Sequence, residues 1–179
     1  MENQFPKWTI LTLIVKDGMS HRVRVGHTLI QKAVYLLQNA LGADVGYNFK
    51  LYHYGPYSEE LWGDLRILSD LDIVSIQTDP NGYGYRISIA DEEKAKLFQD
   101  SRSESLNGKI NELMELLRHK DVKSLELLAT THFVYSDLVA KNRQATPSDV
   151  ASYVTKLKPH FSSEQAKRAL RTLQDQSWC

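Results

Sequence analysis

The chain has 179 residues, of which 42% are hydrophobic, so it is long enough to bury a core without disulfides or metal ions. Lys plus Arg and Asp plus Glu both number 22, so no net charge draws the whole molecule to nucleic acid or to an anionic membrane. The single cysteine, Cys179, excludes an internal disulfide, and the apolar run at residues 8–15 is too short to span a bilayer. We therefore expect a soluble, cytoplasmic protein without a targeting segment.

The first predicted helix begins near Pro6 and carries an apolar run that ends at Asp17-Gly18, a pair typical of a helix stop. The next segment, residues 19–27, has no helical periodicity and is therefore expected to be an exposed loop. This loop is basic, because it contains His21, Arg22, Arg24 and His27.

The second predicted helix spans residues 29–41 and is capped by Thr28. Apolar residues recur in two adjacent stripes, one at positions 29, 33, 36 and 40 and the other at 30, 34, 37 and 41. Such a wide apolar face predicts a central helix that is largely buried. Gly42 and Gly46 end it, and residues 48–54 alternate polar with aromatic or apolar side chains, which indicates a short strand.

A turn at Gly55-Pro56 is expected to lead into the third helix, because Gly55 accepts a positive φ and Pro56 fixes the next one. Ser58 is a strong N-cap for this helix. Glu59 and Glu60 follow in its first turn, where negative charge suits the helix dipole. One side of the helix is apolar, with leucines at positions 61, 65, 68 and 71.

A β-hairpin is predicted after the third helix, with strands at residues 73–77 and 83–89 on either side of an Asp-Pro-Asn-Gly turn at 79–82. Helix, helix, strand, helix and hairpin is the order of elements in a winged helix. We therefore expect a mainly α (α+β) fold in which residues 1–100 form a winged-helix-like domain with the hairpin as its wing.

The chain after residue 90 is expected to be helical throughout. A short helix at residues 91–100 precedes the polar residues 101–105, which we take as the boundary of the winged-helix domain. Amphipathic patterns and capping residues then predict helices at 106–117 and 125–133 and helix starts at Thr146-Pro147 and Ser162. Residues 101–179 are thus predicted to form a C-terminal helical bundle, either as a separate extension or packed into the same core.

Catalytic signatures are missing from the sequence. It has no glycine-rich phosphate loop, no H-E-x-x-H, no cysteine cluster and no G-x-S-x-G elbow, and its six histidines lack metal-ligand spacing. His132 falls on the apolar stripe of its helix, which favours a hydrogen-bonded core residue over a ligand. We therefore expect a protein that is not an enzyme and that holds no cofactor or metal ion.

The predicted third helix is acidic, because its surroundings from residue 58 to 72 contain five carboxylates against Arg66 alone. Such a helix would be repelled by phosphate, and it better suits a basic protein surface or an imitation of the charge pattern of nucleic acid. Aromatic residues that could form a binding hot spot cluster in the same region. The candidate partner-binding residues are Tyr57, Glu59, Glu60, Trp62, Asp64, Tyr83 and Tyr85.

Three segments resemble a known family. Residues 31–37 read QKAVYLL, residues 54–61 read YGPYSEEL, and residues 124–133 read SLELLATTHF, and together they resemble the YwgA-like family, to which no reaction is assigned. The Q-K-x-x-Y pattern and the Y-G-P turn are also similar, more distantly, to the SocA-like, or Panacea, antitoxin domain and to the C-terminal domain of DarG-type antitoxins. The resemblance implies a protein-interaction role in a toxin–antitoxin or defence setting, and the motif also has a purely architectural interpretation.

Three functional hypotheses follow. The leading one is a non-catalytic winged-helix protein that binds a protein partner, as an antitoxin does. The alternative is a winged-helix transcription regulator, a homodimer through its C-terminal helices, that binds DNA through a continuous basic face formed by Arg22, Arg24, Lys167, Arg168 and Arg171. The third is an enzyme subunit or a small-molecule sensor, which requires a pocket between the two halves of the chain.

Overall fold

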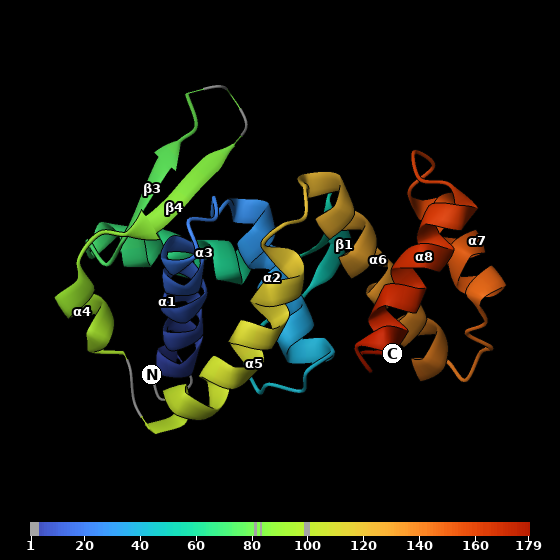
Figure 1. Ribbon diagram of the computed structural model, residues 1–179, viewed down its shortest axis with the longest axis horizontal. Helices are drawn as coiled ribbons and strands as arrows, with labels where there is room; N and C mark the ends of the chain where they lie inside the picture. Colours follow the sequence, from blue (N-terminus) through green and yellow to red (C-terminus); the bar gives the residue numbers. More distant parts are fainter. Residues whose placement is uncertain (1–3, 81, 83, 99–100) are drawn as a thin grey trace.

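The chain is mainly helical and contains two small antiparallel hairpins (Figure 1), which confirms the mainly helical part of the predicted fold class. The computed structural model describes residues 4–80, 82, 84–98 and 101–179. The helices are α1 (Gln4–Ser20), α2 (His27–Asn39), α3 (Glu59–Asp70), α4 (Glu92–Lys96), α5 (Ser101–Leu117), α6 (Val122–Ala140), α7 (Pro147–Leu157) and α8 (Ser163–Asp175). The strands are β1 (Lys50–Tyr52), β2 (Gly55–Tyr57), β3 (Val74–Thr78) and β4 (Tyr85–Ile89). No helix of the described ranges is long and apolar enough to cross a membrane.

The end of α1 differs from the prediction, because the helix continues through Asp17 and Gly18 to Ser20. Gly18 does not end the helix. It is needed for packing, because a Cβ atom built on it would overlap Cγ2 of Val25. The basic loop is consequently shorter than predicted. His27 already belongs to α2, whose N-cap is Gly26 without a side-chain hydrogen bond, so the expected cap at Thr28 was wrong.

Helix α2 lies at the centre of the molecule, as the two apolar stripes predicted. Every residue from Leu29 to Leu37 is buried. The helix packs against α1, α5, α6, β2 and β4. Because it contacts elements from both halves of the chain, its polar side chains can bond to segments that are distant in sequence.

The hairpin β1–β2 stands where one strand and a turn were expected. Its register pairs Lys50 with Tyr57 and Tyr52 with Gly55, so the turn lies at residues 53 and 54. Gly55-Pro56 therefore belongs to a strand, and the predicted turn at this dipeptide was wrong. The expected positive φ of Gly55 is confirmed at +86°.

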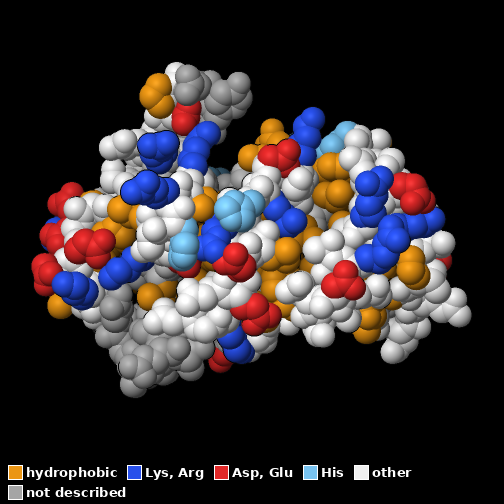
Figure 2. All heavy atoms as spheres, viewed as in Figure 1, with side chains coloured by type: hydrophobic (Ala, Val, Ile, Leu, Met, Phe, Trp, Pro, Cys, Tyr) orange, Lys and Arg blue, Asp and Glu red, His pale blue; other side chains and the backbone are white. Residues whose placement is uncertain are grey.

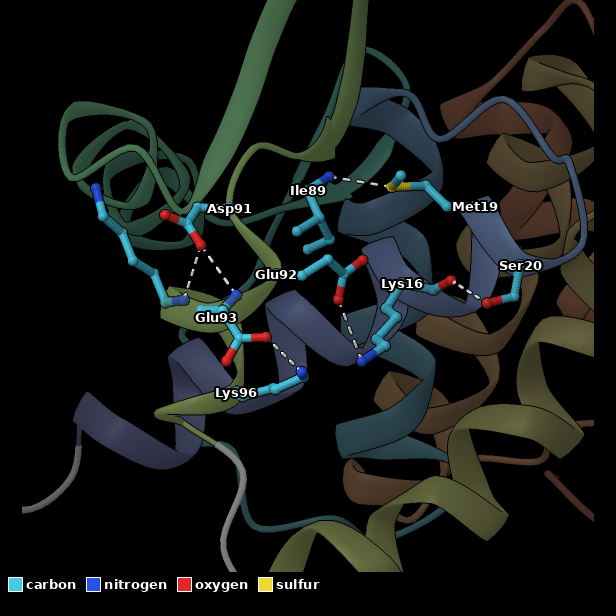
Figure 3. A network of polar contacts seen from close by, with 9 residues as sticks. Lys16, Met19, Ser20, Ile89, Asp91, Glu92, Glu93 and Lys96 are labelled. Carbon is cyan, nitrogen blue, oxygen red and sulfur yellow. Dashed lines mark hydrogen bonds and ion pairs between the residues drawn. The ribbon is translucent and has the colours of Figure 1, made fainter.

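The hairpin β3–β4 confirms the predicted second hairpin, with Val74 paired to Ile89. The segment between α1 and α2 lies beside it, because the backbone N–H of Ile87 donates to the carbonyl of Val25 at 2.8 Å. Figure 3 shows how the end of β4 and α4 attach to α1. The N–H of Ile89 lies 3.1 Å from Sδ of Met19, and Lys16 forms an ion pair of 3.4 Å with Glu92.

The buried apolar residues form two clusters. The main one combines side chains from α1, α2, α3 and the β3–β4 hairpin with side chains from α5, from the first half of α6 and from the C-terminal Trp178. The second lies between the end of α6, α7 and α8. Residues 101–105, which the sequence suggested as a boundary, form the first turns of α5. Figure 1 shows α7 and α8 at one end of the long axis and α4 and the β3–β4 hairpin at the other.

Candidate functional site

Two glutamines of α2 hold the two ends of the segment that contains β1–β2. The amide of Gln31 donates to the carbonyl of Ser58 and accepts from its N–H, both at 2.9 Å. Gln38, two turns later, makes the same pair of 2.9 Å bonds with the backbone of Tyr47. Each side chain thus replaces a neighbouring strand, and the segment between residues 47 and 58 is fixed to α2 at both ends.

Two buried lysines bind backbone carbonyls of the β1–β2 hairpin. Lys32 of α2 donates to the carbonyl of Pro56 at 2.8 Å, and burial lowers the pKa of its ammonium to about 7 although Glu126 opposes this shift. Lys158, which follows α7, donates to the carbonyls of Tyr52 and His53 and forms an ion pair of 3.0 Å with the buried Glu126. The backbone of the hairpin is therefore held at several carbonyls by buried side chains of α2 and of the residue after α7.

The Q-K-x-x-Y motif thus has an architectural explanation, as the sequence allowed. Gln31 and Lys32 bind the backbone of the Y-G-P-Y-S segment, and Tyr35 shares a 2.9 Å hydrogen bond with Nδ1 of His132. His132 is buried, and burial lowers its pKa to about 4, so it is a neutral core residue at pH 7. Its prediction as a hydrogen-bonded core histidine is confirmed.

Aromatic rings from four elements meet around His27 at the start of α2. Its ring lies 4.3 Å from Trp62 of α3, 5.7 Å from Tyr57 of β2 and 6.5 Å from Tyr85 of β4, measured between centroids. Trp62 and Tyr85 are 5.2 Å apart. Burial lowers the pKa of His27 to about 4, with the charge of Lys32 as a smaller cause, so the ring is neutral at pH 7. We call His27, Tyr57, Trp62 and Tyr85 the aromatic cluster.

The aromatic cluster reaches the surface. His27, Tyr57 and Trp62 are partly exposed, and 40% of Tyr85 is accessible to solvent. Exposed aromatic rings in a fixed arrangement lose little entropy on binding, which is why such residues dominate protein interfaces. The cluster can therefore present a large apolar contact without first becoming ordered.

An open cleft of about 510 Å³ lies beside the cluster, between β1–β2 and the N-terminus of α3, and is lined by Asn48, Lys50, Tyr52, Tyr57, Glu59 and Glu60. Glu60 forms an ion pair of 2.5 Å with Lys7 of α1. Within the part of the chain that the structure describes, Glu59 has no ion partner and is exposed. The predicted cap at Ser58, whose hydroxyl accepts from the N–H of Leu61, holds both glutamates in the first turn of α3.

Most of the predicted partner-binding residues lie together around the cleft and the aromatic cluster: Tyr57, Glu59, Glu60, Trp62 and Tyr85. Asp64 does not, because it is only 3% exposed and accepts a 2.7 Å hydrogen bond from the hydroxyl of Tyr47. Its position three residues after Leu61 and four before Leu68 places it on the inner face of α3, a signal that the sequence contained. Tyr83 lies outside the described residues.

His27 was the residue that sequence reasoning missed, since it was placed in an exposed loop. No local pattern marks it. Its surroundings come from three segments that lie between 30 and 58 residues further along the chain.

The residues of the predicted basic face fall into two groups. Arg22 and Arg24 lie in the segment between α1 and α2, and Arg24 forms an ion pair of 2.9 Å with Asp79, the residue after β3. Lys167, Arg168 and Arg171 lie on α8, near the opposite end of the long axis (Figure 1). In Figure 2 the basic side chains near the hairpin and those over α8 lie in different parts of the surface, and the region between them mixes basic, acidic, hydrophobic and uncharged side chains. These five residues therefore do not form one continuous face.

The described residues contain no group of three or more His, Cys, Asp and Glu side chains that could hold a metal ion. Cys179 is partly buried, and burial raises the pKa of its thiol to about 12, so it is protonated at pH 7. The aromatic cluster and the cleft beside it present aromatic rings and the carboxylates of Glu59 and Glu60. Comparison of the chain with models of protein families and with curated proteins gave no match.

Proposed function

We propose that this chain is a non-catalytic protein that binds another protein through the aromatic cluster and the N-terminal half of α3. The observation that carries the proposal is the ring arrangement itself: Tyr57, Trp62 and Tyr85 meet around the uncharged His27 and remain partly open to solvent. Tyr and Trp are the residues most enriched among those that dominate binding energy. Glu59, beside the cleft, adds a charge that favours a basic residue of the partner.

We also propose that the first half of the chain is a winged helix. The order α1, residues 23–25, α2, α3, β3, β4 supports this interpretation, together with the bond between Ile87 and Val25 that sets the first extended segment beside the hairpin. The β1–β2 hairpin is then an insertion between the second and third helices. In this interpretation the partner contacts the helix and the wing that many winged helices use for DNA.

The resemblance to SocA-like and DarG-type antitoxins suggests the class of partner, a toxin protein that the chain neutralises. Its motif residues Gln31 and Lys32 hold the hairpin and are buried. They therefore hold the backbone that carries Tyr57 of the aromatic cluster. The exposed residues of the cluster can then differ between this chain and those antitoxins. If this proposal is correct, coexpression of the chain with a toxin encoded by a neighbouring gene should restore the growth of cells that the toxin alone inhibits.

The test is affinity purification of the tagged protein from its native cells, with and without nuclease and with neighbouring genes expressed alongside. A stoichiometric protein partner should survive nuclease and be lost with Tyr85→Ala and Glu59→Lys. Tyr153→Ala on α7 and Glu164→Lys at the start of α8 are matched controls, because Tyr153 is 39% exposed and Glu164 occupies the capped first turn of its helix. Equal loss with the controls, or no protein partner at all, would contradict the proposal.

A DNA-binding regulator is the alternative outcome of this experiment. Recovery of nucleic acid without a protein, with salt-sensitive DNA binding that Arg22→Ala and Arg24→Ala abolish, would favour it. Its support is weaker, because the candidate cations lie in two separate groups and Arg24 already pairs with Asp79.

A further inference from the structure

Gly63 lies in the middle of α3, although glycine is among the least favourable residues inside a helix. Nothing lies within 4 Å of a Cβ atom built on it, and its φ is outside the left-handed region. Gly18 of α1 is different, because a Cβ there would overlap Val25. Within the described residues, no packing contact or backbone conformation therefore requires a glycine at position 63.

The side chains around Gly63 include two opposite charges. Residues three and four positions apart share one face of a helix, so Glu59, Gly63, Arg66 and Ile67 lie together on α3. Glu59 and Arg66 are exposed, and neither has an ion partner among the residues described by the structure. Ile67 is 42% exposed. This face thus combines one apolar side chain, two charges without an ion partner among the described residues, and a glycine that leaves open space between them.

We infer that this face of α3 pairs with the same face of a second copy of the chain, with the two helices antiparallel and crossing at Gly63. In an antiparallel pair a residue after Gly63 lies opposite a residue equally far before Gly63 in the other copy. Arg66 of each copy, three residues after Gly63, then lies opposite position 60 in the first turn of the other copy. Glu60 is already paired with Lys7, so the neighbouring Glu59 is the carboxylate that Arg66 meets, and the two-fold axis produces this ion pair twice. The missing side chains at the axis let the two helices approach closely.

The charges select this orientation. A parallel pair would place Glu59 against Glu59 and Arg66 against Arg66, and like charges in contact disfavour a complex. The inference goes beyond the proposed function, because pairing through α3 needs no other protein. It also has a consequence for that function: Glu59 is used in both, so a protein partner competes with the second copy.

Gly108 of α5 provides a matched comparison. It is also helical, and a Cβ atom built on it also meets nothing within 4 Å. Its neighbours one turn later, Asn111 and Glu112, are exposed and polar, without an apolar or basic side chain. Gly108 therefore has the open space of Gly63 without the complementary surroundings.

The first experiment is disulfide trapping of the purified full chain, in which Gly63→Cys and Gly108→Cys are each made together with Cys179→Ser. A cysteine at a two-fold axis meets its own copy, so mild oxidation should convert Gly63→Cys into a covalent dimer many times faster than Gly108→Cys. Equal rates for the two variants would overturn the inference.

The second experiment is sedimentation of the unmodified protein and of charge variants. The protein should be a dimer that Glu59→Arg dissociates and that Glu59→Arg combined with Arg66→Glu restores. Gly63→Leu should give a folded monomer, whereas Gly108→Leu should leave the dimer intact. At about 100 μM a dimer with a micromolar Kd would be almost fully assembled, so a monomer at this concentration overturns the inference. So does a dimer that survives Gly63→Leu. Sedimentation measures pairing of the purified chain alone, whereas loss of a protein partner is also tested with Tyr85→Ala, which lies on β4 outside the pairing face, so the two proposals fail separately.

Discussion

Gln31 is the side chain whose replacement best tests how the site is held. Gln31→Met keeps the length of the side chain and removes both of its hydrogen bonds to Ser58, which is itself 1% exposed. The N–H of Ser58 loses the amide oxygen, and its carbonyl keeps only a long bond of 3.4 Å from the N–H of Trp62. A buried unpaired group costs about 1–3 kcal/mol and a lost hydrogen bond about 1 kcal/mol, so the free energy of unfolding should fall by about 2–4 kcal/mol.

Gln38→Met is the matched control for this prediction. Gln38 makes the same two 2.9 Å bonds, with the backbone of Tyr47, but its side chain is only partly buried. Water can take the place of the lost amide there, so the free energy of unfolding should fall by only about 1 kcal/mol.

Urea denaturation followed by circular dichroism measures both values on the same protein. The reasoning is refuted if Gln31→Met costs no more than Gln38→Met, because burial of the Ser58 backbone would then contribute nothing. Gln31→Met should also weaken capture of the protein partner, since Ser58 is the N-cap that positions Glu59.

Three further predictions concern groups away from this pair. Nitrogen-15 NMR should show His27 and His132 titrating near pH 4; because the unfolded chain binds their protons from about pH 6.5, stability should fall as the pH decreases from about 6.5 to about 4. Titration near pH 6.5 would contradict their burial. The lowered pKa of Lys32 means that the unfolded state holds more protons from about pH 7 upward, so stability should rise toward pH 10, and Lys32→Met should flatten this rise in urea denaturation. An unchanged profile would show that Lys32 is solvated. Gly18→Ala should lower the melting temperature, with a cost of about 1–3 kcal/mol, because its Cβ overlaps Val25; an unchanged value would mean that the α1–α2 loop moves freely.

Helix starts were predictable because their signals are local. Ser58, Thr146 and Ser162 each accept a hydrogen bond from a backbone N–H three residues later, and Ser162 completes a capping box with Gln165. Such contacts depend on a few consecutive residues, so the sequence contains all of their information. The start of α2 was misplaced because Gly26, its N-cap, has no side chain to signal the role.

The errors in the candidate site have a different cause. The spacing of Asp64 from Leu61 and Leu68 marks the inner face of α3, but its partner, the hydroxyl of Tyr47, lies 17 residues away in sequence, so a buried role for the carboxylate was not predicted. The bonds between Gln31 and Ser58 span 27 residues, so the fixed position of the hairpin was equally invisible. The grouping of Tyr57, Trp62 and Tyr85 was predictable from their density in the sequence, whereas their common neighbour His27 was not.

The contact between Lys158 and the β1–β2 hairpin also determines an order of events during synthesis. Its ammonium binds carbonyls of residues that lie 105 and 106 positions earlier in the chain. The ribosome therefore releases the hairpin long before it releases the residue that donates hydrogen bonds to those carbonyls. In the nascent chain Gln31 and Lys32 are available to the hairpin before Lys158 is, so the full set of contacts around the hairpin cannot form until the residues after α7 have been made.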